Sequence, residues 1–291
     1  MKLFYKVVDV FTFRRYFGNP VAVLLNAEGL AADEMQRIAN WTNLSETTFV
    51  LPPETAEADY TLRIFSPRSE LAFAGHPTLG SAHAILEAGL ATSRPGGGLI
   101  QQCDAGLIQL SVGKREAVPE LYFSLPPAQF QPLGEADLTE LALILGRKVE
   151  IESAPAIVNV GLNWIVAQLN DATSVIDLRP DFARLAALEH RLGVAGLTVF
   201  GTHKHGEAAI EVRAFAPSSG VLEDPVCGSG NGSVAAFQWE RGLLPSEGVD
   251  YVAAQGRCVG REGRVRVSVD VRGNIRVGGA CVTCLDGWLM R

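Results

Sequence analysis

The sequence has little of what several common protein classes need. Its five cysteines are an odd number scattered over 291 residues, so we expect a reduced, cytoplasmic protein without a disulfide framework. Lysine and arginine total 25 against 32 aspartates and glutamates, and no basic stripe is present, which excludes a nucleic-acid partner. No apolar run could cross a bilayer, and the N-terminal segment lacks a signal-peptide cleavage site, so we expect no membrane association.

Signals for cofactors and metals are also scarce. Only five lysines occur, none of them in a glycine-rich loop, which disfavours a Schiff-base cofactor. The run EDPVCGSGNG at 223–232 has no lysine after its glycines and lacks the spacing of a dinucleotide-binding turn. His203 and His205 fall in a predicted hairpin turn, where no third metal ligand is apparent. We therefore expect neither a metal nor an organic cofactor.

The sequence does have an internal repeat. The segment LRIFSPRSELAFAGHPTLG from Leu62 matches VRAFAPSSGVLEDPVCGSG from Val212 at an offset of 150 residues, with three extra residues in the second copy. Further upstream, VVDVFTF and GNPVAVLL resemble AIVNVGLNWIVAQL, which places Asn19 opposite Asn163. Each half then reads as two strands, a helix, two strands, a loop, a second helix and further strands.

Two similar halves predict two domains related by a pseudo-twofold axis. We expect an N-terminal lobe at 1–120 and a C-terminal lobe at 121–291, with the last strand, about 277–291, returning to the first lobe. The cleft between such lobes is the natural ligand site. Each half would direct a glycine loop and a helix start at that cleft, where free N–H groups and the helix dipole favour a carboxylate.

The halves differ at positions that carry chemistry. Glu46 lies opposite Gly196, just before an apolar strand, and burial there would raise its pKa from about 4.3 toward neutrality. Such a group suits a general acid or base, whereas the alternative is a solvated glutamate. His76 lies opposite Ser229 and would donate to a substrate oxygen or relay a proton, or else would bond its own turn.

The inserted residues of the second copy add two further candidates. Asp224 precedes Pro225 and is either a site carboxylate or the cap of an Asx turn, and Glu223 beside it is interpreted as solvated. Cys227 lies at a predicted helix N-terminus, where the dipole would lower its pKa; the alternative is a small buried residue.

Five segments in the same order carry a family resemblance: VDVFTFRRYFGNPVAVLL, NLSETTFVLP, FSPRSELAFAGHPTLGSAHAIL, EVRAFAPSSGVLEDPVCGSGNGSVAAF and QGRCVGREG. They resemble the PhzF-like isomerases of the phenazine-biosynthesis type. The resemblance implies an α+β protein of the diaminopimelate epimerase-like fold. In that fold each of two similar domains wraps a curled mixed sheet around a central helix.

The resemblance also implies a function, that of a cofactor-independent isomerase acting on a small carboxylate metabolite. The catalytic residues would be Glu46, His76 and Asp224, and the substrate-binding residues would be Asn19, Gly75, Cys227, Gly228, Ser229 and Gly230. Relatives of this family are often homodimers, so a second copy of the chain is an expected partner.

One departure from related enzymes leaves alternatives open. Thiol epimerases carry a cysteine before a glycine in each half, but here Ala74 stands at the first position and Cys227 at the second. A two-thiol mechanism is therefore excluded. An epimerase or racemase that opposes Cys227 to a carboxylate remains an alternative, as does a carboxylate-binding protein without catalysis.

Overall fold

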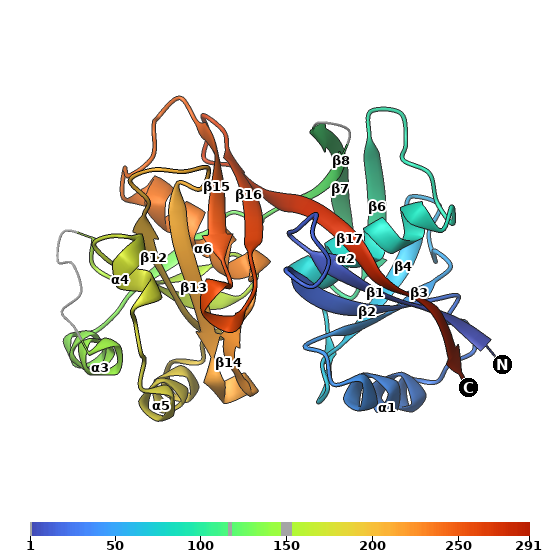
Figure 1. The fold of residues 1–291 in the computed structure, drawn as a ribbon, viewed down its shortest axis with the longest axis horizontal. Helices are drawn as coiled ribbons and strands as arrows, with labels where there is room; N and C mark the ends of the chain where they lie inside the picture. The colour runs from blue at the N-terminus through green and yellow to red at the C-terminus, as the bar shows by residue number, and fades with distance from the viewer. Residues whose placement is uncertain (1, 116–117, 147–152) are drawn as a thin grey trace. The chain divides into compact units, whose positions relative to one another are not determined.

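The computed structural model describes residues 2–115, 118–146 and 153–291, which form two compact units (Figure 1). Unit 1 comprises Met1–Phe123 and Gly278–Arg291, and unit 2 comprises Ser124–Val277. In each unit, strands surround one buried helix.

The strands of unit 1 close into a ring around helix α2 (Gly75–Glu87). They pair in the order β1–β2–β3–β4–β6–β7–β8–β17 and back to β1, with parallel pairs at β2–β3 and β4–β6. The elements are β1 (Lys2–Val10), β2 (Asn19–Leu25), α1 (Ala32–Thr42), β3 (Thr47–Leu51), β4 (Tyr60–Phe65), β5 (Glu70–Leu71), β6 (Gly98–Cys103), β7 (Gly106–Arg115), β8 (Val118–Ser124) and β17 (Ile275–Met290).

Helix α2 is central because its sequence, GHPTLGSAHAILE, has small or apolar residues on every side. It is buried from His76 to Ala82, and a Cβ built on Gly80 would lie only 2.4 Å from Val21 of β2. This close approach of helix and sheet fixes the start of α2 relative to β1, β2 and β3.

Unit 2 repeats this arrangement around helix α6 (Gly228–Glu240). Its strands pair in the order β9–β10–β11–β12–β13–β15–β16, with parallel pairs at β11–β12 and β13–β15. The elements are β9 (Gln129–Pro132), α3 (Glu135–Leu145), β10 (Ala156–Asn159), β11 (Asn163–Gln168), α4 (Ala172–Ile176), α5 (Phe182–Leu192), β12 (Gly196–Thr202), β13 (Ile210–Ala216), β14 (Val221–Asp224), β15 (Val249–Gln255) and β16 (Gly263–Val269).

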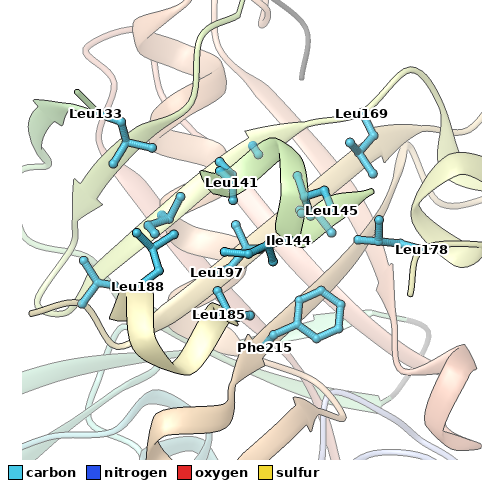
Figure 2. Packing of buried hydrophobic residues seen from close by; sticks show 14 of the residues in the cluster. Leu133, Leu141, Ile144, Leu145, Leu169, Leu178, Leu185, Leu188, Leu197 and Phe215 are labelled. Carbon is cyan, nitrogen blue, oxygen red and sulfur yellow. The ribbon is translucent and has the colours of Figure 1, made fainter. Parts of the chain in front are cut away.

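Helices α3 and α5 pack beside each other and against the sheet of unit 2 (Figure 2). Leu141 and Ile144 of α3 meet Leu185 and Leu188 of α5, above Phe215 of the sheet. The sequence analysis identified α5 but not α3 or α4, because neither has a counterpart in the first half.

Strand β17 begins in unit 2 and then pairs with β1 of unit 1, from Val10 opposite Cys281 to Lys2 opposite Met290. In Figure 1 it is the red ribbon that lies along the blue strand β1. Within the described ranges, no helix has both the length and the apolar character that a membrane span requires.

Candidate active site

Three of the predicted site residues meet in unit 1, each at the start of an element. Asn19 is the first residue of β2, Glu46 immediately precedes β3, and His76 is the second residue of α2. Strands β2 and β3 run parallel, and the N–H of Ala22 donates to the carbonyl oxygen of Glu46 at 3.3 Å. This pairing holds the Glu46 backbone beside β2.

The side chains of these three residues form a connected row. His76 Nε2 lies 3.3 Å from Glu46 Oε2, and His76 Nδ1 lies 3.4 Å from the amide nitrogen of Asn19. An amide NH₂ can only donate, so with Asn19 oriented in this way Nδ1 is the acceptor. The ring proton then sits on Nε2, which faces the carboxyl group of Glu46.

Burial makes Glu46 an unusual carboxylic acid. Its side chain is 18% exposed, and burial raises its pKa to about 7, an effect opposed by a hydrogen bond from Ser45. Its Oε2 accepts no hydrogen bond of good geometry from any residue that the structure describes. A carboxyl group that is half ionised near neutral pH can both take and give a proton, as a general acid and base must.

The residues around this row are held by packing and hydrogen bonds. Thr48 of β3 bonds Ser81 of α2 at 2.8 Å and the carbonyl of Ala22 at 3.2 Å, which ties the helix to both strands. A Cβ on Gly75 would lie 2.8 Å from the Phe123 ring, so a larger residue here would displace that ring. The N-cap residue Ala74 provides no side-chain acceptor, which leaves the N-terminus of α2 suited to an anion.

In unit 2 the predicted residues follow one another along the start of α6. Asp224 ends β14, Cys227 is the N-cap of α6, and Gly228, Ser229 and Gly230 form its first turn. The thiol of Cys227 accepts the N–H of Gly230 at 3.2 Å.

The prediction that the helix dipole lowers the pKa of Cys227 is wrong. Burial raises the pKa of this thiol well above its ordinary value, and the nearby Asp224 carboxylate raises it further. The thiol is 5% exposed, so the low polarity around it outweighs the dipole and the capped N–H of Gly230.

Asp224 forms the local turn that the sequence analysis gave as its alternative role. Its Oδ1 accepts the N–H of Val226 at 3.0 Å, and its side chain is half-buried. This bond fixes the carboxylate close to the first turn of α6.

Sequence reasoning missed Gln255, which holds this loop from behind. Gln255 is 1% exposed and ends β15. Its Oε1 accepts from the N–H of Cys227 at 3.1 Å and from Asn231 at 2.7 Å, and its Nε2 donates to the carbonyl of Asp224 at 2.9 Å. The available signal was an amide side chain directly after the apolar run YVAA.

Unit 2 cannot repeat the glutamate–histidine pair of unit 1, because Trp164 fills the corresponding place. Ser229, the counterpart of His76, accepts the indole N–H of Trp164 at 3.1 Å. A Cβ on Gly196, the counterpart of Glu46, would lie 2.6 Å from the Trp164 ring and 2.1 Å from the carbonyl oxygen of Phe215. Unit 2 therefore has no carboxyl group at the position that corresponds to Glu46.

The nine predicted site residues thus fall into two groups, with four in unit 1 and five in unit 2. Each group converges on the start of one central helix, and the prediction of a ligand cleft between the halves stays a prediction. No three His, Cys, Asp or Glu side chains of the described segments are placed to hold a metal ion.

The chain is similar to known proteins over nearly its whole length. The model of the family described as phenazine biosynthesis-like protein, PhzC-PhzF, matches residues 8–287. Antisense-enhancing sequence 1 of Schizosaccharomyces pombe is 40% identical, with 97% of each chain covered. An uncharacterized isomerase of Mesorhizobium japonicum is 33% identical, with 98% of each chain covered.

Solved structures confirm the predicted α+β, epimerase-like fold. The crystal structure of a Bacillus anthracis protein of the PhzF family has a TM-score of 0.89 at 23% identity, and each chain is covered completely. A hydroxyproline epimerase from Agrobacterium vitis has a TM-score of 0.66 at 14% identity, covering 99% of this chain and 91% of the epimerase.

Proposed function

Because the chain belongs to the phenazine biosynthesis-like protein family and, like those relatives that are named isomerases, is an isomerase, we propose that it moves a proton between two carbon atoms of a small carboxylate. Glu46 is the proposed general acid and base, and no cofactor takes part. The observation that carries this proposal is the buried Glu46 carboxyl group, with a pKa of about 7, placed 3.3 Å from His76.

The proposed proton transfer needs no reacting group other than the substrate and Glu46. The Glu46 carboxylate takes a proton from an acidified C–H bond, and the bonding electrons delocalise into the substrate as an enolate-like anion. The Glu46 carboxylic acid then returns a proton to a different carbon atom. The substrate is isomerised, and the carboxylate is restored.

His76 and the start of α2 would stabilise the transient negative charge. The Nε2–H of His76, set by Asn19 at Nδ1, would donate to a substrate bound beside Glu46. Together with the N–H of Gly75, it forms a preorganised set of donors, each of which can contribute about 3 kcal/mol to a transition state.

For unit 2 we propose a binding role. The N–H of Gly228 would hold a substrate carboxylate, whereas the N–H of Gly230 already donates to the Cys227 thiol. Ser229 and Asp224 would contact polar groups of the substrate. The support for these roles is the repeat, the family motif and the Gln255 network that fixes the loop.

The test is an isotope experiment with a matched control. Wild-type protein, Glu46→Gln and Glu28→Gln are incubated with a metabolite extract in D₂O, and mass spectrometry identifies compounds that gain one deuteron. Glu28 is exposed, so its variant controls for the loss of a carboxylate. We expect labelling by the wild type and Glu28→Gln and none by Glu46→Gln.

Two outcomes would contradict the proposal. Equal labelling by Glu46→Gln would remove Glu46 from the mechanism. Tight binding of a carboxylate by the wild type without any deuterium uptake would instead favour the binding protein without catalysis.

A further inference from the structure

A hollow in unit 2 lies beside the hairpin turn between β12 and β13. It has a volume of about 350 Å³, which is in the range of small-molecule sites. It is lined by His203, His205, Gly206, Glu207, Ala208, Glu211, Ala254, Gln255, Arg257, Arg261, Glu262 and Arg264. Three arginines and two histidines therefore surround one small cavity.

Two of the three lining carboxylates are engaged by neighbouring side chains. Glu207 lies 4.0 Å from Arg264 and 3.5 Å from Arg266. Glu211 is buried and bonds His203 at 3.0 Å. Glu262, the third, is exposed to solvent. The carboxylates of Glu207 and Glu211 are therefore held by protein partners.

Arg261 is the residue that calls for a ligand. Its Nε is buried and has no hydrogen-bond acceptor among the described residues, and its Nη1 reaches only the carbonyl of Gly260 at 3.5 Å. Because the Nε has almost no accessible surface, a ligand in the cavity would bind the Nη groups of Arg261, whose N–H donors are otherwise largely unused. Arg257, from the short 3₁₀ helix Arg257–Val259, lines the same cavity.

We propose that this cavity binds a small oxyanion with two negative charges through Arg257 and Arg261. Guanidinium groups match the oxygen geometry of phosphate and carboxylate groups, and two of them favour a dianion over chloride. Inorganic phosphate and a short dicarboxylate share this chemistry. The inference is independent of the proposed isomerase mechanism.

Gln255 connects the cavity to the start of α6. The same side chain lines the cavity and binds the loop at Asp224 and Cys227. An anion in the cavity would therefore rest against the residue that positions this loop. Slower hydrogen exchange of the Cys227 amide is the expected consequence.

Isothermal titration calorimetry tests the site in chloride buffer of low ionic strength. The wild type is titrated with inorganic phosphate and, separately, with succinate, and the same titrations are made with Arg257→Met, Arg261→Met and Arg272→Met. Arg272 is the control, an exposed arginine in the turn between β16 and β17. We expect binding of at least one anion, weakened about 10-fold or more by each of the first two changes and unchanged by the third.

The two anions distinguish the sources. Binding of phosphate alone assigns a phosphate group, and binding of succinate alone assigns a dicarboxylate. If Arg261→Met folds poorly, Arg261→Lys provides the test in its place. It keeps the positive charge but removes the paired N–H donors, so it should weaken anion binding. The proposal is overturned if neither anion binds, if Arg257 and Arg261 changes leave binding intact, or if Arg272→Met weakens it equally.

Discussion

Arg213 donates two parallel hydrogen bonds to Glu223, from Nε at 3.0 Å and from Nη2 at 2.7 Å, and both side chains are buried. Arg63 and Glu70 form the same bidentate pair in unit 1, at 2.7 Å for both bonds, but at a partly exposed position. The repeat therefore extends from the sequence to an ion pair in each unit. It also corrects the interpretation of Glu223 as a solvated residue.

The two pairs should differ in their effect on stability. Glu223→Gln leaves a buried guanidinium without its counter-charge and should lower the free energy of unfolding by about 3–5 kcal/mol. Glu70→Gln, at the more exposed pair, should cost about 1 kcal/mol or less. Urea denaturation of the two variants and the wild type measures both changes in the free energy of unfolding. Equal changes would contradict the claim that burial makes the Arg213–Glu223 pair the more costly one to break.

The buried Glu46 should make stability depend on pH. Its pKa is about 7 in the folded chain and about 4.3 in an unfolded one, so the folded state binds the extra proton between these values. The stability from this proton is fully present below pH 4.3 and is lost as the pH rises through 7. Relative to Glu46→Gln, the wild type should lose up to about 3 kcal/mol between pH 5 and 8 in urea unfolding. If the difference in the free energy of unfolding between the wild type and Glu46→Gln does not change with pH, the Glu46 carboxyl group is exposed to water.

Replacement of Asn19 should change the tautomer of His76. Asn19→Asp substitutes an acceptor for the amide donor, which draws the ring proton to Nδ1 and leaves Nε2 without one. Because Nε2 can then no longer donate to the transient negative charge, isomerisation should slow by about 10²-fold or more. The ¹⁵N chemical shifts of His76 report the tautomer separately from the rate, and unchanged shifts would refute the assignment.

Cys227 should behave as a packing and capping residue. Its thiol is buried with a raised pKa, so iodoacetamide should react with it far more slowly than with the exposed Cys258. Cys227→Ser keeps an acceptor for the N–H of Gly230 and should keep the deuterium exchange rate within about 10-fold. Rapid alkylation of Cys227 that a ligand prevents would instead favour the thiol epimerase.

The parts of the structure that follow local rules could be predicted from the sequence. The apolar spacing of Met35 and Ala39 predicts a helix where α1 lies, and the spacing of Leu185 and Leu188 predicts one where α5 lies. Gly89 follows the end of α2, and Gly242 that of α6, each with a left-handed φ that suits glycine. Glu46 was identified because it breaks the repeat just before an apolar strand.

The parts of the structure that depend on contacts between distant residues could not be predicted from the sequence. Trp164 bonds Ser229 from 65 residues away, and Gln255 bonds Cys227 from 28 residues away, so neither role has a local pattern. The pKa of Cys227 was misjudged because the dipole is visible in the sequence, whereas burial is set by the complete unit. Helix α3 could not be predicted from the repeat, because it has no counterpart in the first half of the chain.

Strand β17 has a consequence for how the chain is made. It supplies the strand between β1 and β8, so the ring around α2 stays open until the residues of β17 leave the ribosome. The half that is synthesised first is thus the last to be completed. A fragment that stops at Phe123 would expose two unsatisfied strand edges, and it should aggregate unless a peptide with the sequence of β17 is added.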